Sequence, residues 1–331
     1  MPDPALAEAT AHARAAASRV VAVVVTYNRE QLLADCLDAL AAQERRPDAV
    51  VVIDNDSSDG SGAVADAHPI GADVLHLRRN VGGAGGFATG IARALVRHEA
   101  DWIWVMDDDT VPAPGALAAL LDALESSPVR LSVLSSRAVW TDGRTHPMNS
   151  SRVRLGASGQ DRRDARTATR DGRPIRTASY VSALLSGEDV RRLGLPYADY
   201  FIWSDDFEHT GRLLRRGRGL HVPDSVVEHR TARFGDAQSN PGNRFYYDVR
   251  NRTWALLRTT SFAPWEKAVY GGRTLLGWAT RLLRHRGDLL GIGLRGLGAA
   301  LRRGPRPSPA VLAADGEAAA DVRAIDRAAG R

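Results

Sequence analysis

The chain has 331 residues, of which 44% are hydrophobic, and its mean hydropathy of −0.26 is typical of a protein that folds in water around one large core. A single cysteine, Cys36, excludes an intramolecular disulfide framework and a cysteine-rich zinc site. No apolar run approaches the roughly 18 residues of a spanning helix, and the N-terminus lacks the basic flank and apolar core of a signal peptide, so neither is expected. The net charge of +5 and a pI near 9.8 favour an anionic partner.

The first third of the chain alternates strand and helix patterns. Residues 1–18 are rich in alanine, and we expect a disordered or loosely helical extension there. The β-branched run at 20–26 predicts a buried strand, the spacing of leucines over 30–43 predicts a helix, and 49–53 predicts a second strand that stops at Asp54, Asn55 and Asp56. Such a βαβ repeat predicts a parallel sheet.

A glycine-rich segment follows the short third strand predicted at 74–77. The sequence NVGGAGGF at 80–87 has four glycines, which allow a close approach of backbone to a ligand at the start of a helix expected over 87–98. Phosphate binding is one use of that geometry, although the spacing is not the dinucleotide-binding fingerprint and it does not follow the first strand.

Three adjacent acids end the strand predicted at 102–106. Asp107 and Asp109 share one face of an extended segment, while Asp108 points to the other face. Neighbouring carboxylates repel each other unless a cation neutralises them, so Asp107 and Asp109 are candidate ligands for a hard divalent ion.

The middle of the chain contains a helix from Pro112 to about Ser126, a strand over 131–139 and a strand over 179–185 that turns into a short helix. Residues 141–176 are polar and lack periodicity, and they are expected to form a long loop or a small excursion over the site. We expect the apolar stretch at 200–203 to be a further strand that ends in acids, Asp205, Asp206 and Glu208, followed by a helix over 207–217. Two short strands over 220–228 then lead to His229.

Basic residues gather near the C-terminus. Between Arg244 and Arg306 thirteen Lys or Arg face three acids, a local charge of about +10, on segments with amphipathic helical spacing. The expected organisation is an extension at 1–18, a catalytic domain at 19–243, a basic helical region at 244–303 and a disordered tail at 304–331.

The acids therefore gather at three expected strand ends, which a parallel sheet places along one edge. Such an edge can hold a nucleotide diphosphate through a metal and still supply a separate carboxylate as a general base.

The motifs TYNR, IDNDSSDG, NVGGAGGF, WVMDDDT, FIWSDD and VVEH occur in this order. In that order they resemble the inverting family 2 glycosyltransferases, and NVGGAGGF with FIWSDD is similar to the galactofuranosyltransferases of bacterial galactan synthesis, of the initiating type. The resemblance implies an α/β GT-A fold: a Rossmann-like, mostly parallel sheet with helices on both faces and a helical C-terminal extension. Ser204 separates Trp203 from the acid pair, which departs from the usual family pattern.

The resemblance also implies roles for individual residues. Asp206 would be the catalytic base with Asp205 beside it, and Asp107, Asp109 and His229 would hold Mn or Mg. Nucleotide-sugar contacts would come from Thr26, Tyr27, Arg29, Asp54, Asn55, Asp56, Asn80, Gly82, Gly83, Gly85, Gly86, Phe87 and Asp108. Acceptor contacts would come from Trp203, Glu208, Tyr247, Arg250 and Asn251.

The function so implied is metal-dependent transfer of galactofuranose from UDP-galactofuranose to a polyprenyl-diphosphate-linked glycan in cell-wall synthesis. The basic region would lie on the inner face of the cell membrane, which makes the expected location cytoplasmic and peripheral, and a homo-oligomer stays open. No nucleic-acid partner is expected. Two alternatives remain: a rhamnosyl- or other hexosyltransferase that uses a dTDP- or UDP-sugar, and an inactive transferase-like glycan-binding protein. A nucleotidyltransferase is disfavoured because TYNR is not its glycine-rich basic signature.

Overall fold

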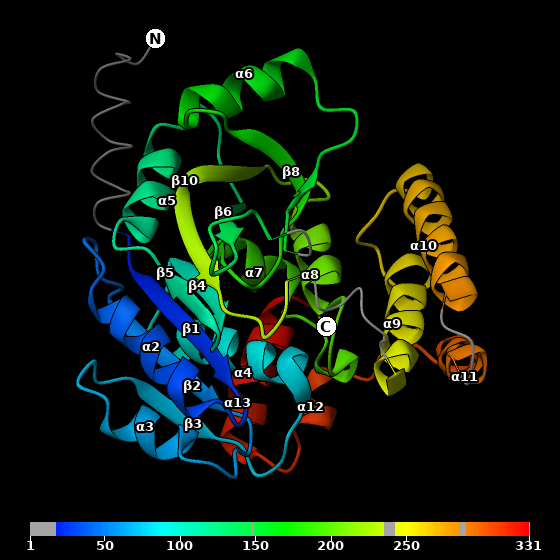
Figure 1. The fold of residues 1–331 in the computed structure, drawn as a ribbon, viewed down its shortest axis with the longest axis horizontal. Coiled ribbons are helices and arrows are strands. Elements are labelled where there is room, and N and C mark those ends of the chain that lie inside the picture. The colour runs from blue at the N-terminus through cyan, green and yellow to red at the C-terminus, as the bar shows by residue number, and fades with distance from the viewer. Residues whose placement is uncertain (1–17, 147–148, 235–241, 285–288, 331) are drawn as a thin grey trace.

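The computed structural model describes residues 18–146, 149–234, 242–284 and 289–330, so almost all of the extension predicted at 1–18 lies outside the described residues. A single sheet runs through the molecule (Figure 1) in the order β3-β2-β1-β4-β9-β6-β10-β8-β7, with β5 paired to β10. The strands are β1 (Val20–Thr26), β2 (Ala49–Asp54), β3 (Asp73–His76), β4 (Trp102–Asp107), β5 (Thr110–Pro112), β6 (Val133–Val139), β7 (Arg152–Val153), β8 (Arg173–Thr177), β9 (Ala183–Ser186) and β10 (Gly219–His229).

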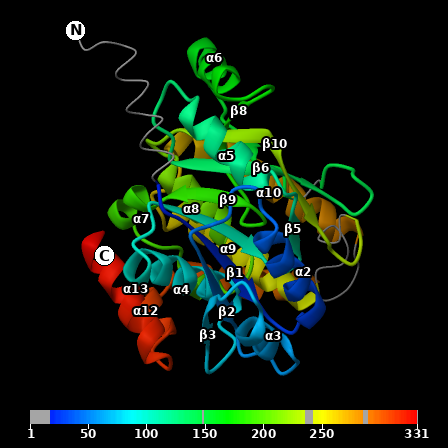
Figure 2. The ribbon, with the colours of Figure 1, turned by 90° about the vertical axis from the view of Figure 1, so that its left-hand side faces the viewer.

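The first four strands form the parallel part of the sheet. Strand β1 pairs in parallel with β2 and β4, and β2 pairs in parallel with β3. All seven residues of β1 are buried, because successive side chains enter the two cores on opposite faces of the sheet. Figure 2 shows α4 (Gly82–Arg97) on one side of these strands and α2 (Glu30–Ala41) on the other. Helices α3 (Ser61–Ala67), α5 (Ala116–Glu125) and α7 (Gly187–Leu193) complete the two layers.

The second half of the sheet is mixed in direction. Strand β9 is antiparallel to both β4 and β6, whereas β6 is parallel to β10. The predicted α/β fold with a mostly parallel central sheet, helices on both faces and a helical C-terminal region is confirmed.

Two segments differ from the expectation. Residues 141–176 contain β7, β8 and α6 (Gly159–Ala168), whose capping box joins Ser158 to Asp161, so most of the predicted loop is ordered structure at the sheet edge. The apolar stretch at 200–203 is not a strand, because a short 3-10 helix, η1 (Ala198–Tyr200), leads into backbone with positive φ at Phe201, Trp203 and Ser204. The helix after it is α8 (Asp205–Leu213).

The C-terminal region is helical. Helices α9 (Phe245–Leu257), α10 (Pro264–Arg284) and α11 (Leu289–Arg302) stand to one side of the sheet (Figure 1), and η3 (Gly242–Arg244) precedes them. Among the described residues, no helix combines the length and the apolar character that crossing a bilayer requires.

The prediction of a disordered tail at 304–331 is wrong for the described residues. Helices α12 (Ser308–Val311) and α13 (Gly316–Ala328) return to the sheet, and α13 packs against α4 (Figure 2). Its apolar face, which includes Val322 and Ile325, belongs to the same core as β1 and α4. Ion pairs from Arg93 to Glu317 and from Arg97 to Asp321 flank this contact at 2.6 and 3.1 Å.

Because Ile325 is buried in that core, Ile325→Ala is expected to lower the free energy of unfolding by about 2–5 kcal/mol, as large-to-small core substitutions do. Arg323→Ala, on the exposed side of the same helix, is the matched control and should change stability little. Urea unfolding followed by circular dichroism measures both variants. Equal stability of the two variants would mean that α13 does not pack in solution.

Candidate active site

The acidic turn after β4 and the end of β10 meet at one edge of the sheet. Asp107 ends β4, and Asp109 directly precedes β5, which pairs antiparallel with β10 so that Thr110 lies opposite His229. The backbone N–H of Arg230 donates to the carbonyl of Asp109 at 2.8 Å and fastens this contact. The pairing therefore carries His229 to the two carboxylates that the sequence predicted as metal ligands.

These three side chains fit a divalent cation. One ligand atom from each of Asp107, Asp109 and His229 lies within 4.8 Å of the others. The His229 Nε2 atom is 3.0 Å from Asp109 Oδ1, while His229 Nδ1 is 3.1 Å from Asn149 Oδ1. If Nδ1 carries the proton and donates it to Asn149, Nε2 is left with a lone pair that faces the carboxylates. Asp109 Oδ1 is buried and has no hydrogen-bond partner of good geometry, as expected of an oxygen placed for a cation.

The electrostatics of the acidic turn follow from its burial. Burial and then the charge of Asp109 raise the pKa of Asp107 to about 7, and burial raises the pKa of Asp108 to about 6 against the opposing charge of Arg29. Burial also disfavours the charged form of Asp109, but His229 and Arg29 outweigh it and lower its pKa. The Arg29 guanidinium is paired with Asp109 and lies 3.7 Å from Asp108.

Some of the predicted nucleotide-sugar contacts are buried and others are exposed. Asp108 accepts hydrogen bonds from the Thr26 hydroxyl at 2.9 Å and from the Tyr27 backbone N–H at 3.2 Å, so its carboxylate ties the end of β1 to the end of β4. Asp54 and Asn55 are buried and engaged within the protein, with His76 and with the Val81 N–H respectively. Tyr27, Arg29 and Asp56 expose their side chains at this edge.

The glycine-rich segment is itself helical, so the helix begins earlier than the start at residue 87 that the sequence predicted. Helix α4 starts at Gly82, where φ is +75° and a Cβ would overlap the carbonyl of Phe201. Gly86 faces the sheet, where a Cβ would overlap Val25, and Gly85 is equally filled by Val81. Phe87 is buried against Tyr180. Gly85, Gly86 and Phe87 therefore serve packing, and only Gly83 has open space beside it.

A strained loop carries the second acid pair. Phe201, Trp203 and Ser204 have φ between +63° and +69°, a conformation that costs energy in residues other than glycine and persists only where the surroundings enforce it. The Asn251 side-chain amide donates to the carbonyls of Tyr200, Ile202 and Trp203 at 2.8–2.9 Å. The Arg250 guanidinium donates to the carbonyls of Asp199 and Tyr200 at 2.6 and 3.1 Å.

Three predicted acceptor contacts are therefore corrected. Arg250 and Asn251 are buried and hold the loop, so their donors are already used. Glu208 is fully buried, pairs with Arg212 at 3.0 Å and accepts a hydrogen bond from Ser261. Trp203 and Tyr247 are half-buried and remain predicted acceptor contacts, and the ring of Tyr247 stacks on Phe201 at 5.2 Å.

Asp205 and Asp206 open α8 directly after this loop. Burial raises the pKa of Asp205 well above its usual range, and the charges of Asp206 and Asp107 raise it further, so the two acidic clusters act on each other. Burial also raises the pKa of Asp206, although the Phe207 N–H and the positive charges of Arg252 and Arg152 oppose the rise. Asp206 is the more exposed member of the pair. A partly exposed carboxylate with a raised pKa suits proton abstraction.

The sequence did not reveal two residues that shape the site. Asn149 orients His229, and it lies in the segment predicted as a loop. His146 is buried and its ring lies 4.9 Å from that of His229. His146 lies in the same predicted loop, where no periodic pattern indicates a contact with a residue as distant in sequence as His229.

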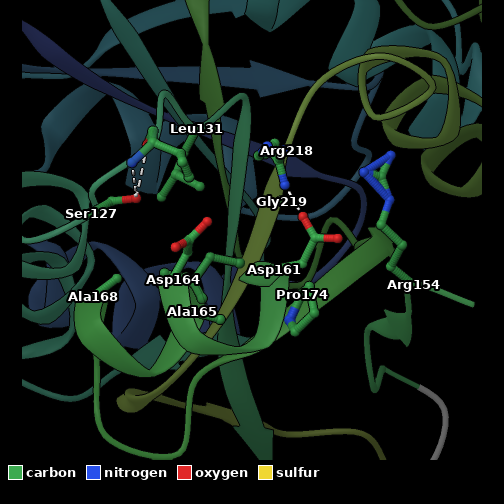
Figure 3. A pocket seen from close by; sticks show the side chains of 12 residues that line it. Ser127, Leu131, Arg154, Asp161, Asp164, Ala165, Ala168, Pro174, Arg218 and Gly219 are labelled. Carbon is green, nitrogen blue, oxygen red and sulfur yellow. Dashed lines mark hydrogen bonds and ion pairs between the residues drawn. The ribbon is translucent and has the colours of Figure 1, made fainter. Parts of the chain in front are cut away.

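A separate small cavity lies away from this edge, under α6 (Figure 3). It is lined by Ser127, Leu131, Asp164 and Arg154 among others, and the ion pair of Asp161 with Arg218 borders it. Its volume of about 20 Å³ has room for little more than one water molecule, which excludes it as a substrate site.

Residues 21–185 match the family model of Glycosyl transferase family 2. The galactofuranosyltransferase GlfT1 of Mycolicibacterium smegmatis is 34% identical over 200 residues, which cover 60% of this chain and 66% of that protein. GlfT1 of Mycobacterium tuberculosis is 35% identical over 207 residues, 60% of this chain and 65% of that protein. The match thus spans slightly less than two thirds of the length of these relatives.

Solved structures show the same fold. S. aureus TarS in complex with UDP-GlcNAc superposes with a TM-score of 0.57 at 15% identity, covering 93% of this chain and 90% of that one. The mannosyltransferase PcManGT from Pyrobaculum calidifontis, solved with GDP-Man and Mn²⁺, gives 0.52 at 20% identity, covering 99% and 93%. At such identities the likeness concerns the fold alone. The match over residues 21–185 and this fold together identify a glycosyl transferase family 2 domain in the chain.

Proposed function

We propose that the protein is an inverting, metal-dependent glycosyltransferase that moves galactofuranose from UDP-galactofuranose to a glycan acceptor linked to a lipid diphosphate. One observation carries the proposal: a group suited to a cation, Asp107, Asp109 and His229, and a separate acid pair, Asp205 and Asp206, interact at the same edge of the sheet. The names of the GlfT1 relatives support the choice of sugar.

In this proposal each cluster has its own task. A divalent cation, Mn²⁺ or Mg²⁺, held by Asp107, Asp109 and His229 would neutralise charge on the departing nucleotide diphosphate. Tyr27, Arg29, Asp56, Asn80, Gly82 and Gly83 contact the donor, while Thr26, Asp54, Asn55 and Asp108 hold the loops that carry them. Asp206 takes the proton from the acceptor hydroxyl, whose oxygen attacks the anomeric carbon from the side opposite the nucleotide. Attack from that side inverts the configuration.

The test is a donor panel with the full chain and a synthetic lipid-diphosphate-linked disaccharide acceptor, in Mn²⁺ and in EDTA. Metal-dependent product from UDP-galactofuranose alone supports the proposal. Product only from a dTDP- or UDP-hexose would replace the sugar by rhamnose or another hexose and keep the reaction. Metal-dependent UDP binding without product from any donor would favour an inactive glycan-binding protein.

We further infer that α10 and α11 rest on the inner surface of the cell membrane. Helix α10 exposes Leu275, Leu276 and Leu283 by 63%, 67% and 80% of their surface, and α11 exposes Leu290, Leu294 and Leu301 by more than half. Exposed apolar residues among arginines are the pattern of a helix that lies in the headgroup region of an anionic bilayer.

The triple substitution Leu275→Ser, Leu276→Ser and Leu283→Ser should therefore abolish most sedimentation with phosphatidylglycerol vesicles, since three large apolar side chains leave the interface. Val96→Ser, an exposed apolar position on α4, is the control. Point substitutions are preferable to truncation because α13 contributes to the core. A homo-oligomer that dissociates in the triple variant, without any change in vesicle binding, would contradict the inference.

A further inference from the structure

A pocket rich in arginine lies between β7, α9 and α10. Its volume is about 180 Å³, far above the roughly 10–15 Å³ that one water molecule needs. The lining residues are Arg152, Asp248, Arg252, Tyr270, Arg273, Thr274, Gly277, Trp278 and Arg281. Four guanidinium groups and one carboxylate thus surround one cavity, which gives its wall a net charge of about +3.

The single acid does not neutralise this charge. Asp248 pairs with Arg281 at 2.8 Å, accepts a hydrogen bond from the Trp278 indole at 3.0 Å and lies 3.9 Å from Arg252. The side chains of Arg152 and Arg273 form neither an ion pair nor a hydrogen bond with any part of the chain that the structure describes. Crowding by the surrounding protein and then the charge of Arg252 lower the pKa of Arg152, with Arg273 adding to the effect. Like charges held together without a counter-charge are stabilised by a bound anion.

The pocket adjoins the proposed catalytic base. The Arg252 and Arg152 guanidinium groups lie 4.3 and 5.4 Å from the ring centre of Phe207, the residue after Asp206. Both positive charges act on the Asp206 carboxylate and lower its pKa against the effect of burial. An anion in this pocket is therefore next to the point where the acceptor hydroxyl must lose its proton.

The helix that carries this pocket also carries exposed leucines. Arg273, Gly277 and Arg281 repeat every four residues along α10 and form one face of the helix. Leu276 and Leu283 are exposed, and at about 100° per residue their side chains leave the helix away from that face. The arginine pocket and the apolar surface therefore lie on different faces of one helix.

We propose that this pocket binds the diphosphate group of the acceptor, with the sugar directed to Asp206. Arg152 and Arg273 supply the unpaired guanidinium groups that grip the anion by charge-assisted hydrogen bonds. The inference deepens the proposed function and rests on it for the identity of the sugar. In this proposal the diphosphate of the acceptor is recognised by Arg152 of β7 and Arg273 of α10.

Direct binding tests the pocket without relying on catalysis. The probe is geranyl diphosphate, titrated calorimetrically into the full chain in EDTA so that no cation bridges it to Asp107 and Asp109. Arg152→Gln and Arg273→Gln should each weaken binding by about 10-fold, the size expected for one lost charge-assisted contact. Arg166→Gln on α6 removes the same charge from an exposed position that does not line the pocket, and this variant should bind geranyl diphosphate as the unaltered chain does. Undiminished binding by both pocket variants, or no saturable binding by the unaltered chain, would overturn the proposal.

Steady-state kinetics test the role of the pocket separately from the proposed transferase activity. With a diphosphate-linked acceptor, Arg273→Gln should raise KM about 10-fold at similar kcat, whereas KM for the same disaccharide as a neutral alkyl glycoside should not change. Failure of the unaltered chain to use either acceptor would reject the proposed function, while the geranyl diphosphate titration would still decide about the pocket. Loss of phosphatidylglycerol vesicle binding in Arg273→Gln, with unchanged affinity for geranyl diphosphate, would assign the arginines to lipid headgroups and overturn the proposal.

Discussion

Asp206→Asn is expected to lower kcat for sugar transfer by about 10²–10⁴-fold, the contribution of a positioned general base. An amide has nearly the same shape as the carboxylate but cannot accept the proton of the acceptor hydroxyl. The hydrogen bond from the Phe207 N–H to Asp206 Oδ1, 2.6 Å long, can be kept by the amide oxygen, so the start of α8 should stay intact. Initial rates at saturating donor and acceptor measure the effect.

Binding of UDP in the presence of Mn²⁺ should be unchanged in this variant, because Asp206 is not among the three side chains that fit the cation. Asp122→Asn, an exposed acid on α5, controls for the loss of one negative charge. A normal kcat for Asp206→Asn would move the role of base to Asp205, whose raised pKa also suits proton transfer.

The sequence was sufficient to predict the parts of this site that depend on local pattern. Buried strands that end in acids are legible because apolar runs and polar stops are both local, and β1, β2 and β4 lie where the pattern placed them. Asp107 and Asp109 meet in the group suited to a cation and Asp108 turns to Thr26 and Tyr27, as predicted, although residues 108–109 form a turn and not the extended backbone that the prediction assumed.

Contacts across long sequence distances could not be predicted in the same way. His229 reaches Asp109 because β5 pairs antiparallel with β10. Strand β5 has only three residues, too few for a sequence pattern to predict it. Arg250 and Asn251 looked like ligand-binding residues because they are polar and helical. They are committed instead to the carbonyls of a loop some 50 positions earlier, which the helix pattern cannot show.

Small residues led to wrong predictions in the glycine-rich segment and in the C-terminal tail. The glycines of NVGGAGGF suggested a ligand loop, but at Gly85 and Gly86 the missing side chain lets α4 approach β1. The alanine-rich tail suggested disorder, although Ala318, Ala319, Val322 and Ile325 recur at helical spacing and are buried. Composition hides that periodicity, because alanine is common in disordered and in tightly packed helices alike.

Asp109→Asn is expected to weaken Mn²⁺-dependent UDP binding by more than about 100-fold, since even a change behind the metal ligands costs about 10–100-fold. The substitution removes the negative charge of one of the three ligand side chains and leaves Arg29 with Asp108, 3.7 Å away, as its carboxylate partner. Asn149→Ala provides the graded comparison, because it removes only the group that orients the His229 ring and should cost about 10–100-fold. Calorimetric titration of UDP with Mn²⁺ and with EDTA measures both variants.

In EDTA the two variants should bind UDP with similar affinity, because without a metal ion the three side chains do not contribute to binding of the diphosphate. If Asp109→Asn binds UDP as tightly as the unaltered chain in Mn²⁺, the acidic turn does not hold the metal. In that case Arg29, no longer paired with Asp109, would bind the diphosphate, and the reaction would depend on a guanidinium group in place of a metal ion. The ordering of the losses, greater for Asp109 than for Asn149, is therefore what ties the geometry of this turn to metal-assisted transfer.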